Sequence, residues 1–291
     1  MANGVLIIHK PAGWTSMDVC AKLRGIYHEK RVGHAGTLDP MATGVLPVFL
    51  GRATRAISLL EDSDKEYIAG LQLGVITDTQ DTTGTELERR PVEVTPAQLE
   101  AALAPFRGEI LQVPPMYSAV KRQGKKLYEL ARRGLEVERA PRPVTIHALE
   151  VLEWTGAETC LLRVACSKGT YVRTLCHDIG SALGCGGAMC SLERTRAAGF
   201  TLEQAVTLEQ IQGAPNPEAL LMPVDSCFAG LPMLLLTSPQ AEKKIRSGAA
   251  VTLPIPPGDG LYRLYGEDKT FLALSRAEGT SLTTIKSFFE V

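Results

Sequence analysis

The apolar residues of this chain come in short runs, which limits what it can fold into. Examples are Val5–Ile8 and Met233–Leu236. A membrane-spanning helix needs about 20 consecutive apolar residues, so the sequence predicts no such helix. The residues before His9 are also too few for the core of a signal peptide. We therefore expect a soluble protein that works in the cytoplasm, without contact to a membrane.

Cysteine usage favours the same compartment. The chain has seven cysteines, an odd number that cannot pair completely, and no C-x-x-C pair. A group formed by Cys176, His177, Cys185 and Cys190 has spacings that fit no metal site. We interpret the cysteines as reduced residues that pack as small apolar side chains.

The length of the chain and a change in its composition after about Leu231 predict two domains. At roughly 150 residues per domain, 291 residues fit one large domain, residues 1–230, and one small one, residues 231–291. From about Leu231 onward, proline and glycine separate short apolar runs, which is typical of a small β-rich module. A helical stretch is expected at 240–246.

The larger domain mixes helix and strand signals. Tyr67–Leu73 alternates with period two, as a strand does, and Thr95–Gln98 forms a capping box that begins a helix. Pro47 interrupts the strand candidate Gly44–Leu50, so we expect that strand at an edge or end of a sheet. Further expected elements are strands at 5–8, 144–154 and 160–166, a helix capped by Thr15 or Ser16, a helix at 52–60, and loops at 33–44 and 77–85.

Charge is strongly segregated although the net charge is only -1. Residues 121–142 contain eight basic and three acidic residues, a net charge of +5, and residues 22–55 carry +4. Residues 61–102 carry −7. Such basic blocks indicate a surface that binds polyanions, nucleic acid above all. The alternative is a solvated helix face whose cations pair with glutamates at i,i+4; we favour nucleic acid for 121–142.

The segment Gly33–Pro47 holds a candidate catalytic carboxylate. Asp39-Pro40 is a turn dipeptide, and on its own an aspartate there most often bonds to local backbone. Gly33, Gly36 and Gly44 would also let a ligand approach the backbone closely, so both interpretations are open.

This segment closely resembles the catalytic motif of the TruB-type tRNA pseudouridine synthases. Five further segments resemble motifs of that family and occur in the family's order; they are 10–16 (KPAGWTS), 65–67 (KEY), 114–121 (PPMYSAVK), 169–175 (GTYVRTL) and 192–196 (LERTR). Because Thr37 and Leu38 precede the aspartate, where other pseudouridine synthase families have Arg-Leu, the resemblance is to the TruB type. The chain reaches its first motif within ten residues, which favours the standalone tRNA enzymes over guide-RNA-dependent relatives.

The resemblance implies an α+β (mixed α/β) pseudouridine synthase fold with a large, mostly antiparallel sheet. It also implies a basic RNA-binding thumb insertion at 115–142 and a C-terminal PUA-like RNA-binding module at 231–291. The implied activity is isomerisation of uridine to pseudouridine at position 55, in the T loop of tRNA. Neither cofactor nor metal is implied, and no phosphate-binding glycine motif occurs in the sequence.

The resemblance also assigns roles to single residues. Asp39 would be the essential carboxylate, acting at C1′ or C2′ of the nucleotide, Arg173 its cationic partner, and Tyr67 the stacking aromatic in the catalytic group. Substrate-binding roles fall to His34, Tyr171, Leu192, Lys10, Lys121, Arg122, Lys125 and Lys126. Without the motifs, Tyr67, Tyr171 and Leu192 would be interpreted as core residues and Arg173 as part of a surface ion pair.

Three alternatives stay open. Asp78 and Asp81 with their neighbouring threonines could form a metal loop, which we do not favour. A tRNA-binding folding chaperone would use the same basic insertion without chemistry. A hydrolase acting on a nucleoside bond would need a second carboxylate as proton donor, and none is adjacent to Asp39. We expect a monomer whose partner is the T stem-loop of tRNA, with no protein partner.

Overall fold

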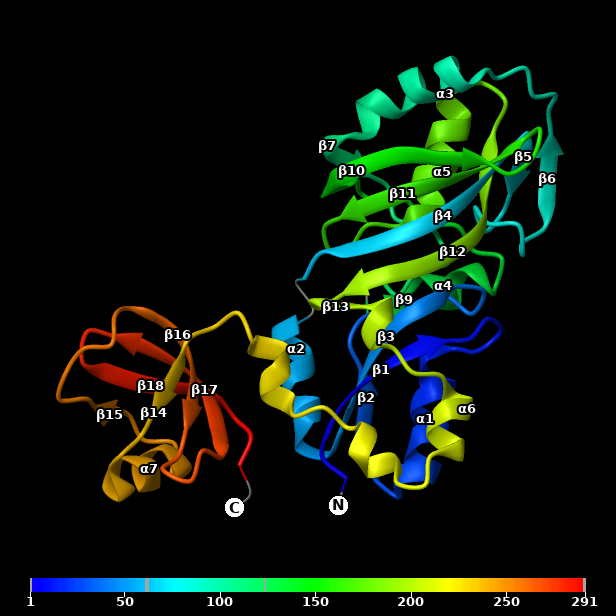
Figure 1. The fold of residues 1–291 in the computed structure, drawn as a ribbon. Helices are drawn as coiled ribbons and strands as arrows, with labels where there is room; N and C mark the ends of the chain where they lie inside the picture. Colours follow the sequence, from blue (N-terminus) through cyan, green and yellow to red (C-terminus); the bar gives the residue numbers. More distant parts are fainter. Residues whose placement is uncertain (1, 61–62, 123, 290–291) are drawn as a thin grey trace.

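The fold was described from a computed structural model, which covers residues 2–60, 63–122 and 124–289. Its main feature is a nine-stranded sheet in the order β1-β3-β12-β4-β11-β10-β7, with β2 paired to β3 and β13 to β12 (Figure 1). The strands are β1 (Gly4–Lys10), β2 (Val32–His34), β3 (Thr43–Leu50), β4 (Lys65–Leu73), β7 (Gly108–Gln112), β10 (Arg142–Trp154), β11 (Thr159–Cys166), β12 (Gly187–Ala197) and β13 (Phe200–Thr201). Pairing is antiparallel except between β12 and β3. The predicted α+β fold with a large, mostly antiparallel sheet is confirmed.

Helices cover the sheet where their apolar faces meet it. On α5 (Val172–Ala182) Leu175 and Ile179 are fully buried, and this helix lies against β12. The other helices are α1 (Ser16–Tyr27), α3 (Pro96–Leu103), α6 (Leu208–Gly213) and the short turns η1 (Gly51–Ala56), α2 (Ile57–Leu60), η2 (Ala104–Phe106), η3 (Leu202–Gln204), η4 (Pro217–Leu220) and η5 (Val224–Phe228). The cap expected at Thr15 or Ser16 is Thr15, which forms a capping box with Asp18, and the capping box expected at Thr95 is formed.

The edge position expected for the Pro47 strand is wrong. β3 lies between β1 and both β2 and β12, so Pro47 lies in an interior strand, opposite Ile7 of β1. Its carbonyl accepts a hydrogen bond from the Ala35 N–H at 2.9 Å, just past the end of β2. Since the N–H and C=O of a strand residue point to the same side, the missing N–H faces the side where β2 has already ended.

Two excursions leave the sheet. The hairpin of β5 (Val75–Thr77) and β6 (Glu86–Arg89) carries a polar turn, residues 78–85, which we call the Asp81 turn. Between the neighbouring strands β7 and β10, the chain forms β8 (Lys121–Arg122), β9 (Lys125–Lys126) and α4 (Leu127–Ala131). This second excursion lies within the basic insertion, residues 115–142.

The C-terminal part is a separate β-rich module, as expected, at the lower left of Figure 1. Its five-stranded sheet has the order β14-β16-β17-β18-β15 and its own apolar core. The elements are β14 (Met233–Leu235), α7 (Pro239–Arg246), β15 (Val251–Thr252), β16 (Gly260–Tyr265), β17 (Phe271–Glu278) and β18 (Ser281–Ser287). Phe271 and Phe288 of the module pack on Phe228 of η5, with ring centroids 6.4 and 6.1 Å away.

Within the described residues, no helix has the length and apolar character needed to cross a membrane. All seven cysteines are free thiols, and five of them are buried.

Candidate active site

The loop between β2 and β3, residues 35–42, presents Asp39; we call it the Asp39 loop. The first sequence motif holds this loop by its backbone. Ser16, the first residue of α1, donates its hydroxyl to the Leu38 carbonyl and accepts the Leu38 N–H at 2.9 Å. On the other side of Asp39, the Gly13 N–H donates to the Pro40 carbonyl at 2.8 Å. The peptide units on both sides of the carboxylate are therefore fixed by the chain segment around residues 13–16.

Lys10 completes this support and is not placed to touch a substrate. Its side chain is fully buried, and its ammonium donates to the carbonyls of Pro11, Pro40 and Ala42 at 2.9, 3.2 and 2.7 Å. Burial lowers the pKa of Lys10 to about 8, although nearby Asp39 acts in the opposite direction. The substrate-binding role predicted for Lys10 is thus replaced by a positioning role, because three backbone carbonyls already use its donors.

Asp39 pairs with Arg173, as the sequence predicts. Arg173 Nε lies 3.0 Å from Asp39 Oδ2, and Nη2 lies 3.4 Å from Oδ1, which is a bidentate arrangement. The Asp39 side chain is 38% exposed, whereas that of Arg173 is only 7% exposed. The carboxylate is therefore open to a ligand while its cationic partner stays behind it.

The remaining donors of Arg173 are used by two other segments. Nη2 donates to the Tyr117 carbonyl at 2.9 Å, and Nη1 donates to the Thr79 carbonyl at 3.2 Å. Nη1 also lies 3.5 Å from Asp81 Oδ2, a carboxylate with 6% exposure. A guanidinium held by three chain segments is rigid, which suits a group that must orient a reacting carboxylate.

The Asp81 turn supports Arg173 through a network of hydrogen bonds within the turn. Asp81 Oδ1 accepts hydrogen bonds from the hydroxyls of Thr79 and Thr83, and its backbone carbonyl accepts the Thr77 hydroxyl. Among the residues that the structure describes, no group of three or more His, Cys, Asp or Glu side chains is arranged to hold a metal ion. Of the two aspartates in this turn, Asp81 forms the ion pair with Arg173.

A buried arginine that sequence reasoning did not single out closes the Asp39 loop at both ends. Arg194 is 1% exposed and donates to the carbonyls of Gly36 and Val45 at 2.9 and 2.7 Å. Gly44 permits this arrangement, since its φ is +99° and an added Cβ would lie 2.3 Å from the Arg194 carbonyl oxygen. Arg194 lies in the sequence motif 192–196, but its role at the Asp39 loop becomes apparent only from the pairing of β12 with β3.

Tyr67 and Leu192 line the same face of the sheet beside this arginine. Tyr67 on β4 is the direct cross-strand partner of Arg194 on β12, and Leu192 pairs with Ala69, two residues along. Tyr67 and Leu192 are 7% and 8% exposed. Burial raises the pKa of Tyr67, so its hydroxyl is neutral near pH 7.

The other predicted substrate residues lie around this centre. His34 ends β2; its Nδ1 is buried and has no hydrogen-bond partner among the described residues, and burial lowers the pKa of His34, which keeps the ring neutral. Tyr171 is the N-cap residue of α5, two positions before Arg173. Its backbone is held by Gln112, a buried residue for which the sequence offers no signal.

Four of the eight basic residues of the insertion, those assigned to substrate binding, lie together on one short hairpin. In the β8–β9 pair, Lys121 faces Lys126 and Arg122 faces Lys125. Like charges directly opposite each other destabilise a hairpin, so a polyanion that binds there would relieve the repulsion. Lys126 is partly engaged elsewhere, since its ammonium lies 5.4 Å from the centroid of the Tyr128 ring.

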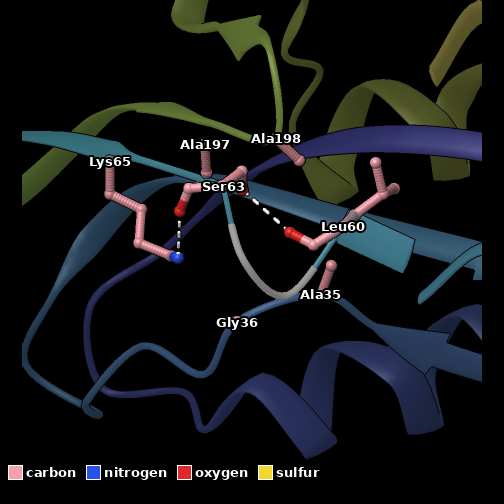
Figure 2. Close-up of a pocket in the computed structure, with 7 residues that line it drawn as sticks. All are labelled: Ala35, Gly36, Leu60, Ser63, Lys65, Ala197 and Ala198. Carbon is pink, nitrogen blue, oxygen red and sulfur yellow. Dashed lines mark hydrogen bonds between the residues drawn. The ribbon is translucent and has the colours of Figure 1, made fainter. Parts of the chain in front are cut away.

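A small cavity on the neighbouring surface is not the substrate site. Figure 2 shows its lining, in which the Lys65 ammonium donates to the Ser63 carbonyl and the Ser63 hydroxyl to the Leu60 carbonyl. Ala35, Gly36, Ala197 and Ala198 complete the lining. Its volume of about 60 Å³ is far below the roughly 300 Å³ of small ligand sites.

Comparison with known proteins identifies the family. Residues 24–172 match the TruB family pseudouridylate synthase (N terminal domain), and residues 173–229 match the tRNA pseudouridylate synthase B C-terminal domain. The chain belongs to the TruB family of pseudouridine synthases. Members of this family are isomerases, because pseudouridine contains the same atoms as uridine, so the predicted enzyme class is confirmed.

Individual relatives agree over nearly the whole chain. The tRNA pseudouridine synthase B of Aromatoleum aromaticum is 46% identical over 98% of this chain and 92% of the relative. The protein of the same name from Stutzerimonas stutzeri is 47% identical over 94% and 90%. Among solved structures, an H/ACA RNP bound to a substrate RNA containing 2'-deoxyuridine superposes with a TM-score of 0.74 at 25% identity, covering 99% of this chain and 85% of that chain. A Cbf5-Nop10-Gar1 complex gives 0.74 at 29% identity, covering 98% and 85%.

Proposed function

We propose that this enzyme isomerises uridine to pseudouridine in tRNA, at position 55 of the T loop, with Asp39 as its essential carboxylate. The observation that carries the proposal is the Asp39–Arg173 pair, in which an accessible carboxylate is held by a buried bidentate guanidinium. The tRNA substrate is supported by the relatives named tRNA pseudouridine synthase B.

The reaction breaks the C1′–N1 bond, turns the uracil and joins it to the sugar through C5. Either an attack of the Asp39 carboxylate on C1′ or removal of the C2′ proton by that carboxylate starts this sequence. Both routes require a carboxylate held in a fixed position, and the bidentate contact with Arg173 holds Asp39 in this way. A hydrogen moves from C5 to N1 in the last step, so no atom is gained or lost.

The uridine must leave its stack before it can reach Asp39. Tyr67 offers an aromatic face for the flipped uracil, and Leu192 lies beside it on β12. His34 and Tyr171 lie at the ends of the elements that flank the Asp39–Arg173 pair, where each can contact the displaced nucleotide. RNA loops are recognised in this way, by shape and by bases that are splayed out of the stack.

Binding outside the site falls to the basic insertion, which we propose acts as a thumb over the T stem-loop. Lys121, Arg122 and Lys125 are exposed on one hairpin, and cations at this density bind phosphates. We propose that residues 231–291 form a PUA-like RNA-binding module. Cytoplasmic location, a monomeric state and independence from protein partners remain predictions.

The test is pseudouridine mapping on an unmodified tRNA transcript incubated with the purified enzyme alone. We expect modification of U55 and none in a transcript that carries C55. Modification at another uridine would contradict the proposed position, and modification only after a guide RNA is added would contradict a standalone enzyme.

The chaperone alternative makes a different prediction for the same sample. A chaperone would bind and refold tRNA without leaving pseudouridine. The hydrolase alternative lacks its proton donor in the described residues near Asp39, because Asp81 is buried and committed to Arg173.

A further inference from the structure

Gln112 ends β7, three residues before the basic insertion begins, and it is 2% exposed. Its side-chain amide makes two complementary hydrogen bonds to one backbone residue on another element. Oε1 accepts the Tyr171 N–H at 2.8 Å, and Nε2 donates to the Tyr171 carbonyl at 3.0 Å. The amide therefore pairs with Tyr171 as a neighbouring strand would.

This pairing fixes the start of α5. Tyr171 is the N-cap residue of that helix but makes no side-chain capping bond, and tyrosine is not among the residues that cap well. Its carbonyl already accepts the Leu175 N–H at 3.0 Å, the first bond of the helix. Gln112 thus supplies from outside the orientation that a capping side chain would otherwise provide.

A second link joins the same two segments. Arg173 on α5 donates to the Tyr117 carbonyl at 2.9 Å, five residues after Gln112. Between them lie Pro114 and Pro115, both buried, whose rings restrict the backbone. The start of the insertion is therefore attached to α5 at two points joined by a stiff segment.

We propose that Gln112 is a positioning residue for pseudouridine formation, which holds Tyr171 and the first turn of α5 so that Arg173 faces Asp39. It touches neither Asp39 nor, by its burial, the RNA. The inference rests on the proposed role of the Asp39–Arg173 pair. It predicts that the loss of Gln112 slows the chemical step and leaves tRNA binding unchanged.

The test compares two variants with a matched control. Gln112→Met keeps the length of the side chain and removes both hydrogen-bonding groups. Gln72→Met does the same at a partly buried glutamine of β4, whose amide bonds to Leu73, Glu158 and Thr159 away from the site. We expect Gln112→Met to lower the single-turnover rate at least tenfold with the tRNA Kd within twofold, and Gln72→Met to change neither.

Gln112→Glu separates positioning from a merely structural role. Its carboxylate can accept the Tyr171 N–H but repels the Tyr171 carbonyl, whereas the protonated acid can donate to that carbonyl as the amide does. Burial raises the pKa of a carboxyl, so the rate relative to wild type should recover as pH falls from about 8 to about 6.

The rates are measured as total pseudouridine formed at saturating enzyme, whichever uridine is modified. Modification of a uridine other than U55 would contradict the proposed position, but the comparison of the Gln112 variants with wild type would still be valid. An unchanged rate in Gln112→Met would overturn the inference. So would equal losses in Gln112→Met and Gln72→Met, or a Gln112→Glu rate that shows no recovery relative to wild type at low pH.

Discussion

At the scale of single residues, the candidate site depends on charged side chains that never reach the surface. Lys10 and Arg194 are 0% and 1% exposed, and each donates to backbone carbonyls of the Asp39 loop or its ends. Burial of a charge is costly unless polar partners surround it. Burying these two charges therefore lowers the stability of the fold, while their hydrogen bonds hold Asp39 in a fixed position.

Lys10 predicts a pH dependence of folding. Its pKa is about 8 in the folded protein against an ordinary value of 10.5. Between about pH 8 and pH 10.5, Lys10 is protonated in the unfolded chain and deprotonated in the folded protein. The contribution of Lys10 to the free energy of unfolding therefore rises with pH in this range. Denaturant titrations at about pH 7 and about pH 9.5 should show wild type gaining stability relative to Lys10→Met as pH rises; a difference independent of pH would contradict this assignment.

Asp81 predicts a selective loss of activity. Asp81→Asn removes the buried negative charge that helps to hold Arg173, and we expect the single-turnover rate to fall at least about tenfold, since misplacing a catalytic group by about 1 Å can cost more. Asp78→Asn is the control, because Asp78 lies in the same turn but accepts only the Thr85 N–H among the described contacts. Equal rates in the two variants would show that the Asp81–Arg173 contact does not matter.

At the scale of elements, the β8–β9 hairpin is notable for four cations that face one another in pairs. Replacing Lys125 and Lys126 by alanine should weaken tRNA binding and reduce the slope of log K against log salt by about 1 to 2 units. The control replaces Arg89 of β6 and the next residue, Arg90, each of which already pairs with a glutamate, Glu86 or Glu88. A slope that falls equally in both double variants would place the phosphate contacts elsewhere.

Local signals in the sequence predict many elements correctly because their causes are local. The capping boxes at Thr15 and Thr95 begin helices as expected, since cap and helix lie within four residues. Pro47 misleads because whether a missing N–H matters depends on where the neighbouring strand β2 ends. That end is a property of the sheet and has no local signature.

The same distinction applies to the candidate site. The motifs place Asp39, Arg173 and Tyr67 in the site; the structure pairs Asp39 with Arg173 and sets Tyr67 opposite Arg194, and the catalytic role of Tyr67 stays a prediction. Gln112 gives no sequence signal because its partner is the backbone of Tyr171, and backbone hydrogen bonds leave no mark on residue type. Lys10 was assigned to the substrate for a related reason, since a lysine in a motif does not reveal that backbone carbonyls already surround it.

At the scale of the whole molecule, the C-terminal module is attached to the large domain. Phe288 is 4% exposed and packs on Phe228 and Phe271, while Arg55 donates to the Ser287 carbonyl at 3.0 Å. An interface with buried aromatic rings restricts relative domain motion. We therefore expect the two parts to unfold in one cooperative transition.

Phe288→Ala tests this attachment. Removing a buried phenylalanine typically costs about 3–5 kcal/mol, and here the loss falls on the interface, so calorimetry should show two transitions in place of one. Ile255→Ala is the control, because Ile255 is 77% exposed and should change stability by less than about 0.5 kcal/mol. A single transition at an unchanged temperature in Phe288→Ala would contradict the coupling.

The central claim is that Asp39 performs chemistry on a tRNA uridine, and one paired measurement tests it most directly. Wild type and Asp39→Asn are each given an unmodified tRNA transcript, and both the Kd and the pseudouridine at U55 are measured. We expect equal affinity within about threefold, full conversion by wild type, and a loss of at least about 10⁴-fold in the variant, since removing an essential group of this kind has such an effect. Conversion by Asp39→Asn at a rate near that of wild type would contradict the account.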